Sequence, residues 1–429
     1  MLFFERAETG EKAVLVHIDF PESREREDPQ EFEMLAASAG ADAICIVTGS
    51  RNGPDPRYFI GTGKVEEIAA IVRDEGAELV LFNHGLSPSQ ERNLEKTLEC
   101  RVLDRTGLIL DIFAQRARTF EGKLQVELAQ LQHLSTRLVR GWTHLERQKG
   151  GIGLRGPGET QLESDRRMVR NRIKAITRRL DKVRKQRNQG RRSRQRADIP
   201  TLSLVGYTNA GKSTLFNQMT ESNVYAADKL FATLDPTLRR LEIADVGPIV
   251  LADTVGFIRH LPHQVVDAFR ATLEETREAD LLLHVVDASG EEREENMVEV
   301  ESVLKEIEAD QIPRLEIYNK IDLLGLPPKI ERDDLGKPIR VWVSAAQDQG
   351  LELISQAISE MLVAPLIEKT LCLTPCQGRL RSAFYQQSAV VSEECLDDGN
   401  LHLTIRIPRK AYYQVLKQLD LSEDKLRYV

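Results

Sequence analysis

The chain contains an eight-residue stretch that matches the phosphate-binding pattern G-x-x-x-x-G-K-[ST]. It follows the apolar run 201–205 and consists of Gly206, Tyr207, Thr208, Asn209, Ala210, Gly211, Lys212 and Ser213. Glycines let successive backbone N–H groups turn toward phosphate oxygens, while the lysine adds a cation and the serine hydroxyl reaches Mg²⁺. The stretch predicts a nucleoside triphosphate site and leaves ATPase, kinase and GTPase open.

A second motif, D-x-x-G, follows the apolar run 249–252 and consists of Asp253, Thr254, Val255 and Gly256. A carboxylate at the end of a strand can hold Mg²⁺, and the glycine N–H can meet the γ-phosphate. A bare D-x-x-G also occurs by chance in polar loops. Its position after the phosphate loop therefore carries as much weight as its letters.

Two further motifs concern the base. Asn319, Lys320, Ile321 and Asp322 follow the run 315–318, and Ser344, Ala345 and Ala346 follow the run 339–343. The Asp322 carboxylate can accept hydrogen bonds from N1–H and the 2-amino group of guanine, which adenine lacks, so adenine leaves a buried acceptor unpaired. Backbone N–H groups of the second segment complete the base pocket. Each motif alone fits an ordinary polar loop, but all four in this order favour a GTPase.

Between the first two motifs lies a loop in which one threonine is expected to reach Mg²⁺ and to order the segment when a γ-phosphate is present. It comprises Phe231, Ala232, Thr233, Leu234, Asp235, Pro236 and Thr237. We choose Thr233 over Thr237. The predicted catalytic groups are then Lys212, Thr233 and Gly256, and the metal ligands are Ser213 and Thr233 with Asp253.

The residue after the D-x-x-G glycine is Phe257, where many GTPases place a glutamine that orients the attacking water. A phenyl ring neither donates nor accepts a hydrogen bond. Because positioning the water is a large part of phosphoryl-transfer catalysis, unassisted hydrolysis is expected to be slow. His260 and His263 lie close by, although histidines in a polar loop are more often solvated than catalytic.

Composition restricts the class of protein. The 429 residues are 41% hydrophobic and 29% charged, ordinary for soluble globular proteins, and predict about three domains on a scale of roughly 150 residues each. No apolar run of about 18 residues occurs, and the first twenty residues carry acids without a basic region, so neither a membrane span nor a signal peptide is expected. Five scattered cysteines indicate a reducing cytoplasm, and Cys372 and Cys376 read better as buried thiols than as metal ligands.

Charge is separated along the chain. The net charge is −8, yet residues 116–196 hold 23 Lys/Arg against 7 Asp/Glu, a net of +16. From Arg166 to Arg196 there are 15 basic residues and one acid, Asp181. A solvated helix face explains most charge runs, but a block of one sign this long favours phosphate contacts with RNA.

The spacing of apolar residues predicts two helices in this basic region. One stripe comprises Leu124, Leu128, Leu131, Leu138, Trp142 and Leu145; the other comprises Leu162, Val169, Ile173, Ile176, Leu180 and Val183. Glycines and a proline at 150–158 separate them. We therefore expect an antiparallel helical hairpin whose tip either contacts a ligand closely or is only a connection.

The remaining segments predict α/β domains, so the domains are 1–115, the hairpin 116–197, the nucleotide domain 198–364 and a small α/β domain 367–429. The nucleotide domain is expected to be a doubly wound, mainly parallel sheet with one antiparallel strand, because 238–246 and 249–252 are joined only by Gly247 and Pro248. The first domain alternates strand and helix, with helices expected at 29–39 and after the helix start at Ser87 and Pro88. Further helices are expected at 265–279 and 351–362, and residues 397–400 (Asp-Asp-Gly-Asn) predict a hairpin turn in the last domain. Within it, residues 61–64 (Gly-Thr-Gly-Lys) precede a helix and form either a second phosphate site or a simple turn.

The chain resembles the HflX family of translation-associated GTPases. The resemblance rests on Gly150 to Arg167 around the tip, on the loop 231–237, on Phe257 and on the first domain, and it covers nearly the whole chain. It implies binding of the large (50S) ribosomal subunit and its 23S rRNA, an approach of the tip to the peptidyl-transferase region, and separation of stalled or idle ribosomes, often under stress. It also implies that the ribosome accelerates hydrolysis.

The sequence therefore predicts a cytoplasmic, monomeric, Mg²⁺-dependent GTPase that binds ribosomes. An alternative is a nucleotide-dependent RNA helicase or ATPase that binds ATP through the first domain. A third is an inert RNA-binding scaffold, which the undegraded motifs disfavour.

Overall fold

The computed structural model describes residues 10–21, 28–140, 157–196, 199–220, 230–259, 273–362, 366–395 and 399–408, and a few positions between 412 and 428. The chain divides into two compact units. The larger unit holds the amino-terminal sheet, the basic hairpin and the nucleotide motifs. The smaller unit comprises residues 352–429, which include the carboxy-terminal sheet, and short segments at 242–247 and 330–339. Within the described residues, no helix is both long and apolar enough to span a bilayer.

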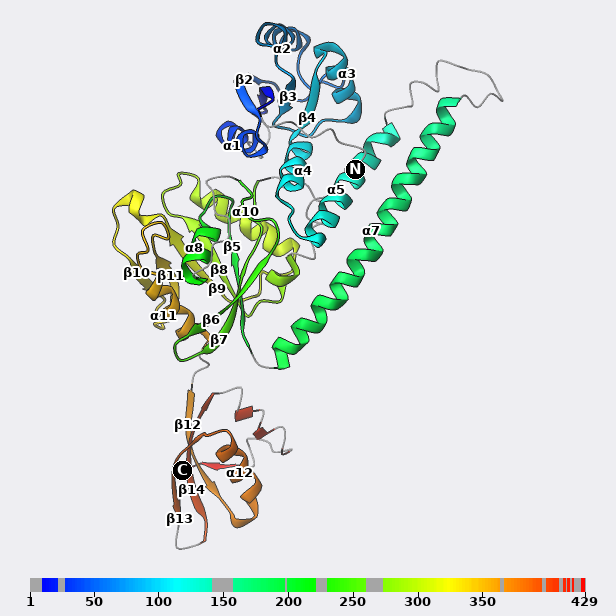
Figure 1. Ribbon diagram of the computed structural model, residues 1–429. Coiled ribbons are helices and arrows are strands. Elements are labelled where there is room, and N and C mark those ends of the chain that lie inside the picture. Colours follow the sequence, from blue (N-terminus) through cyan, green and yellow to red (C-terminus); the bar gives the residue numbers. More distant parts are fainter. Residues whose placement is uncertain are drawn as a thin grey trace. The chain divides into compact units, whose positions relative to one another are not determined.

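The amino-terminal sheet is parallel, with the order β2-β1-β3-β4 (Figure 1). Its strands are β1 (Lys12–Asp19), β2 (Asp42–Ser50), β3 (Leu79–Phe82) and β4 (Arg101–Asp104), and its helices are α1 (Pro29–Ala39), α2 (Thr62–Glu75), α3 (Pro88–Leu98) and α4 (Arg105–Arg116). Ser87 starts α3 with a capping box to Gln90, as the Ser-Pro signal predicts. Each face of the sheet carries its own hydrophobic cluster.

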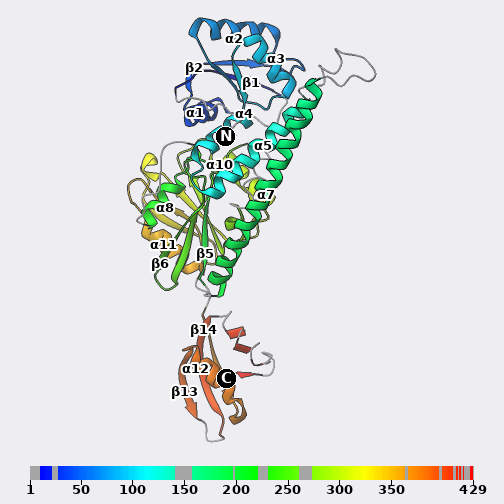
Figure 2. The same ribbon diagram turned by 45° about the vertical axis from the view of Figure 1, so that its right-hand side comes forward.

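Two long helices form the basic hairpin, α5 (Phe120–Arg140) and α7 (Pro157–Arg196). They run side by side in both views (Figures 1 and 2). Leu124 and Leu131 of α5 pack against Val169 and Ile176 of α7, so the predicted stripes meet. Trp142, Leu145 and most of the glycine-rich tip lie outside the described residues.

The nucleotide domain is built on a seven-stranded sheet of order β10-β11-β9-β8-β5-β7-β6. Its strands are β5 (Thr201–Val205), β6 (Thr237–Ile243), β7 (Gly247–Asp253), β8 (Leu281–Asp287), β9 (Arg314–Asn319), β10 (Lys329–Arg332) and β11 (Pro338–Trp342), with helices α8 (Lys212–Thr220), α10 (Arg293–Glu306), α11 (Leu351–Leu362) and the 3-10 turn η1 (Ile321–Leu324). The pairs β5–β7, β5–β8, β8–β9 and β9–β11 are parallel. Each nucleotide motif therefore follows the carboxyl end of a strand, where doubly wound sheets bind their ligands.

One predicted turn is wrong. Gly247 and Pro248 belong to β7, and the connection from β6 is the three residues 244–246, with Asp245 in the left-handed region at φ 65°. Proline is tolerated at the start of a strand, where the ladder has barely begun, so its presence did not mark the turn. The predicted helix 265–279 is described only from residue 273, and it is helical there up to 277.

The carboxy-terminal sheet has the order β13-β14-β12-β15, and its described pairs are antiparallel. Its elements are β12 (Leu366–Leu373), η2 (Pro375–Gln377), α12 (Gly378–Gln386), β13 (Val390–Cys395), β14 (Leu401–Pro408) and β15 (Arg427–Tyr428). The strands on either side of the predicted Asp-Asp-Gly-Asn turn form a hairpin. Cys372 is a free, half-buried thiol in β12, while the side chain of Cys376 lies outside the described part of the chain.

Candidate functional site: a nucleotide site joined to the first domain

The phosphate loop connects β5 to α8, and two of its glycines cannot be replaced without collision. Gly206 has φ 146° and Gly211 has φ 93°, values that side chains rarely adopt. A Cβ at Gly206 would overlap the carbonyl oxygen of Val285, and one at Gly211 would overlap Asn319 Nδ2. The loop is therefore packed against the neighbouring strand ends, with the N-terminus of α8 facing the phosphate position.

Lys212 lies at the bottom of this loop. Its Nζ donates to the carbonyl oxygens of Tyr207 (2.6 Å) and Gly206 (3.1 Å). Burial lowers the pKa of Lys212 to about 8, and the Asp253 carboxylate opposes that shift. A Cβ at Gly256 would stand 2.9 Å from the same Nζ, so the D-x-x-G glycine lies directly over the lysine.

The cavity between these groups is small. Its volume is about 50 Å³, and its lining includes Lys212, Ser213, Ala232, Thr233 and Gly256. It lies between the N-terminus of α8 and the segment 231–233, where the phosphates of a nucleotide are expected.

Three oxygen-bearing side chains meet beside the cavity. Ser213 Oγ lies 2.7 Å from Thr233 Oγ1 and donates to Asp253 Oδ2 at 2.8 Å. The other oxygen, Asp253 Oδ1, is buried and has no hydrogen-bond partner within the described part of the chain. Burial raises the pKa of Asp253, and its hydrogen bond from Ser213 opposes that rise. Hydroxyl and carboxylate oxygens are the ligands that Mg²⁺ prefers, so this cluster fits a magnesium ion.

The base motifs are tied to the phosphate loop by one side chain. Asn319 Nδ2 donates to the carbonyl oxygen of Ala210 at 2.9 Å, and Asn319 Oδ1 accepts from Ala345 N at 2.9 Å. Ser344 Oγ donates to Asp322 Oδ1 at 2.5 Å, while Lys320 Nζ pairs with Asp287 at 2.8 Å. Asp322 is partly exposed and Ala346 is exposed, which leaves the edge of the pocket open to a base.

Phe257 has a structural role that the sequence did not reveal. Its backbone forms two hydrogen bonds with the phosphate loop, Thr208 N to Phe257 O at 2.7 Å and Phe257 N to Gly206 O at 3.1 Å. Its ring is buried in the cluster of Val205, Leu282 and Val300. The side chain therefore points into the core and supplies nothing to a water near the γ-phosphate. His260 and His263 lie outside the described residues.

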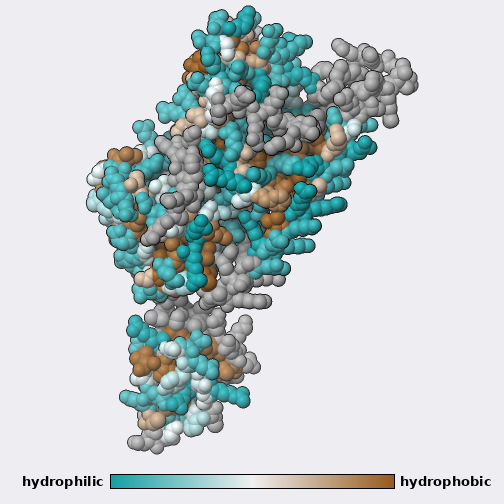
Figure 3. All heavy atoms as spheres, in the orientation of Figure 1, coloured by the Kyte–Doolittle hydropathy of each residue, from teal (hydrophilic) through white to brown (hydrophobic). Residues whose placement is uncertain are grey.

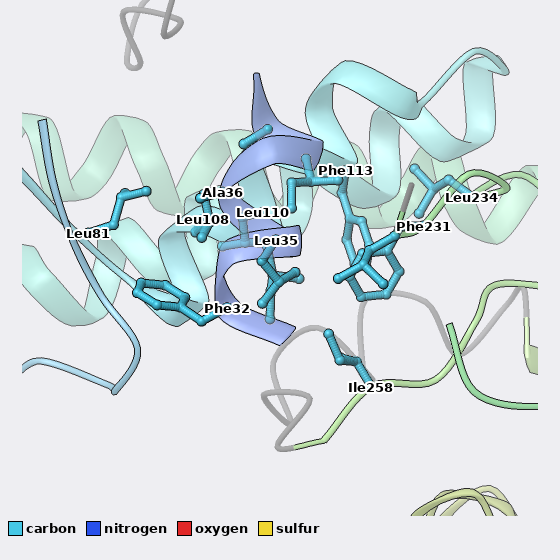
Figure 4. Close-up of a cluster of buried hydrophobic side chains, with 14 of the residues drawn as sticks. Phe32, Leu35, Ala36, Leu81, Leu108, Leu110, Phe113, Phe231, Leu234 and Ile258 are labelled. Carbon is cyan, nitrogen blue, oxygen red and sulfur yellow. The ribbon is translucent and has the colours of Figure 1, made fainter. Parts of the chain in front are cut away.

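Several predicted nucleotide-binding residues turn their side chains toward the first domain instead. Phe231, Leu234 and Val255 are buried with residues of α1 and α4, and Phe231 meets the ring of Phe113 edge-on at 4.7 Å (Figure 4). The Thr254 hydroxyl donates to the carbonyl oxygen of Leu204 at 2.6 Å. These residues can contact a nucleotide only through their backbone.

A polar network crosses the same interface at Tyr207. The Tyr207 hydroxyl donates to the Glu31 carboxylate of α1 and accepts from Arg259 N at 2.9 Å. Arg105 of α4 donates to the other oxygen of Glu31 and to the carbonyl oxygen of Arg259. Burial raises the pKa of the Tyr207 phenol, so it stays protonated. Sequence spacing gave no signal for this network, because its members are up to 228 positions apart.

The basic residues of α7 fall into two groups, those paired with acidic residues and those exposed on the opposite face. Arg172 donates to Glu127 through two nitrogens, Arg187 pairs with Glu121 at 2.9 Å, and Arg184 pairs with Glu274. These arginines flank the apolar stripe and are neutralised within the molecule. Other basic residues of α7 are exposed, and a row of them follows the opposite face at spacings of three or four, including Arg167, Arg170, Lys174, Arg178 and Lys182. Figure 3 shows this helix as a hydrophilic edge.

The segment 61–64 behaves as an ordinary helix start. Gly61 is the N-cap of α2 in an extended conformation, and Lys64 Nζ pairs with Glu67 of the same helix at 2.9 Å. A lysine paired within its own helix is a weaker phosphate ligand than one directed at a cavity. The simple turn is thus the better interpretation.

Known proteins match this chain over nearly its whole length. Family models described as "GTP-binding GTPase N-terminal", "GTP-binding GTPase Middle Region" and "50S ribosome-binding GTPase" match residues 26–114, 116–194 and 201–320. GTPase HflX of Escherichia coli strain K12 is 62% identical over 416 residues, which cover 97% of this chain and 98% of the relative. GTPase HflX of Caldanaerobacter subterraneus subsp. tengcongensis is 44% identical over 403 residues, with 94% and 92% covered.

A solved structure is also similar. A GTP-binding protein from the hyperthermophilic archaeon Sulfolobus solfataricus, in complex with GDP, is 25% identical and has a TM-score of 0.44. The match covers 82% of this chain and 100% of that chain.

Proposed function

Because the chain belongs to the HflX family of GTPases and hydrolyses GTP, we propose that it is a Mg²⁺-dependent switch that binds the large ribosomal subunit in the cytoplasm. It uses the exposed row of α7 to contact rRNA, and it splits or remodels ribosomes under stress. The observation that carries the ribosomal part is that row of basic residues, which lies on a protein of net charge −8. A locally cationic face on an anionic protein restricts polyanion binding to that face.

The nucleotide chemistry follows from the geometry of the site. Ser213 and Thr233 offer hydroxyls, and Asp253 offers a carboxylate, to the ion. When bound, Mg²⁺ neutralises charge that develops on the phosphate oxygens. Lys212 exchanges the carbonyl oxygens of Gly206 and Tyr207 for phosphate oxygens, and the Gly256 N–H faces the γ-phosphate.

Base selection rests on Asp322, and Asn319 holds the base pocket in place relative to the phosphate loop. A carboxylate that accepts from N1–H and the 2-amino group holds guanine and rejects adenine. Because Asn319 bridges Ala210 and Ala345, it links the base pocket to the phosphate loop by two hydrogen bonds. The family models and relatives described above are all named as GTPases or GTP-binding proteins, and none of them is named as a helicase.

Hydrolysis by the isolated protein is expected to be slow, and the ribosome is expected to accelerate it. The ring of Phe257 is buried in the core, so the position after Gly256 supplies no group that orients the attacking water. A partner must therefore provide that group or rearrange the loop. Positioning effects of this kind are worth orders of magnitude in rate.

The experiment is GTP turnover by the purified chain alone, with 50S subunits and with 30S subunits. We expect 50S subunits to raise the rate by roughly 10²-fold or more, since a partner in other GTPases contributes about 10³ to 10⁵. The rate should be unchanged by 30S subunits. Equal turnover in all three samples contradicts the proposal, and no turnover in any sample favours an inert scaffold.

A further inference from the structure

The loop that carries Thr233 is anchored to the first domain and to the hairpin on both sides of that threonine. Before it, Leu230 N donates to Ser38 Oγ of α1 at 3.0 Å, and Phe231 packs on Phe113. After it, Leu234 is buried in the same hydrophobic cluster. Phe231 has φ 55°, which is uncommon for a bulky residue and persists only where packing enforces it (Figure 4).

The polar anchor is Asp235, two residues after Thr233. Its Oδ2 accepts from Arg118 N and Thr119 N, both at 2.8 Å, and its Oδ1 accepts from the Thr119 hydroxyl. Thr119 Oγ1 in turn accepts from Gly122 N at 2.9 Å, so it caps the first turn of α5. The carboxylate thus sits at the N-terminus of α5, where unpaired N–H groups and the helix dipole favour a negative charge.

Gly122 shows that the fit is close. A Cβ at this position would overlap Asp235 Oδ1 and come within 3.2 Å of Thr119 Oγ1. Glycine is otherwise a poor choice inside a helix, because alanine is a better helix former. The first turn of α5 therefore lacks a side chain at the point where the carboxylate docks.

The same turn of α5 is connected to the basic helix. Glu121, next to Gly122, pairs with Arg187 of α7 at 2.9 Å, and Leu124 packs in the hairpin core. A displacement of Asp235 would therefore move the N-terminus of α5 and, through it, the basic hairpin. Conversely, a displacement of the hairpin would move the loop that holds Thr233.

We propose that Asp235 is a positioning residue for Thr233, and that its bond to the start of α5 is the joint through which the GTP site and the basic hairpin act on each other. This inference rests on the proposed role of Thr233 as a magnesium ligand. When GTP draws Thr233 to the ion, the anchored loop fixes the base of the hairpin. Because such coupling is reciprocal, RNA that holds the hairpin also favours the GTP-ordered loop.

Four variants of the full-length protein test the joint by titration calorimetry with a non-hydrolysable GTP analogue and with GDP, over a range of Mg²⁺. Asp235→Ala removes the carboxylate. Gly122→Ala displaces the same carboxylate with a methyl group on α5 and leaves the nucleotide domain unaltered. Thr233→Ala removes the proposed magnesium ligand and shows how large the effect of its complete loss is. Gly378→Ala is the matched control, because it also adds a methyl in the first turn of a helix, α12, and no atom lies within 4 Å of that Cβ.

Both Asp235→Ala and Gly122→Ala should weaken the GTP analogue about tenfold and raise the Mg²⁺ needed for half-maximal binding, since coupling energies of this kind give roughly 5- to 150-fold effects. GDP affinity should stay within about twofold in both, which also shows that the domain is folded. Gly378→Ala should match the parent. If Thr233→Ala weakens binding of the analogue while Asp235→Ala and Gly122→Ala do not, the proposed coupling through Asp235 is refuted and the proposed metal site stands. If Thr233→Ala has no effect, the proposed metal site itself is wrong.

Discussion

Asp322→Asn should transfer the purine preference from guanine to xanthine. The amide keeps the size of the side chain and its hydrogen bond with Ser344, but it replaces one acceptor oxygen by a donor NH₂. Guanine then faces a donor with its own 2-amino group, whereas the 2-oxo group of xanthine can accept. One charge-assisted hydrogen bond is replaced by a contact between two donors and the other loses its charge, at about 1.5–3 kcal/mol each, so GTP affinity should fall by roughly 10² to 10⁴-fold.

Equilibrium competition among GTP, XTP and ATP measures this change. The matched control is Asp310→Asn, the same substitution at an exposed carboxylate between α10 and β9, at the opposite end of the strand from the nucleotide motifs. It should leave all three affinities unchanged. A variant at Asp322 that still prefers GTP to XTP by the parental ratio would show that another group selects the base.

The second large effect should come from the exposed face of α7. Replacing Arg167, Arg170, Lys174, Arg178 and Lys182 by Gln should weaken binding to 50S subunits by on the order of 10²-fold at physiological salt. The slope of log affinity against log salt should also become shallower by about one for each phosphate that the variant no longer neutralises. The reason is that each neutralised phosphate releases counterions into solution.

The control variant changes the arginines that already have acidic partners, Arg172, Arg184 and Arg187. Because Glu127, Glu274 and Glu121 neutralise them, their replacement should alter the salt slope far less. Binding of both variants to 50S subunits is measured from about 50 to 300 mM KCl, the range in which such slopes are steep. Equal slopes for the two variants would mean that the exposed row does not contact phosphate.

The sequence predicted the elements that carry strong local signals. Pro29–Ala39 and Leu351–Leu362 are helices with the predicted bounds, and Thr201–Val205 is the strand before the phosphate loop. A proline at the start and the periodicity of apolar residues suffice for such helices. A short apolar run before a glycine-rich motif suffices for the strand.

The strand β4 and helix α4 were not predicted. Arg101–Asp104 is only four residues long, and α4 follows it without any connecting residue, so no loop signal separates the strand from the helix. Asp104 belongs to the strand and also caps the helix through a bond from Gly107 N. Periodicity cannot divide a run in which the two elements abut.

The contacts that join the nucleotide site to the first domain could not be predicted from the sequence for a different reason. Asp235 and Thr119 are 116 positions apart, and Glu31 and Tyr207 are 176 apart. Such pairs leave no mark in composition or spacing. The motif residues could be named from the sequence, but which of their side chains face the nucleotide and which face the protein depends on tertiary packing.

Bound GTP is expected to prepare this protein to bind the large ribosomal subunit. The direct measurement is sedimentation of the unmodified chain with 50S, 30S and 70S particles, in GDP and in a non-hydrolysable GTP analogue. We predict co-migration with 50S subunits in the analogue and at least about tenfold less in GDP, with none on 30S subunits, because coupling of this size is usual between two linked sites. Co-migration with 30S subunits alone, or equal binding in both nucleotides, would contradict the account.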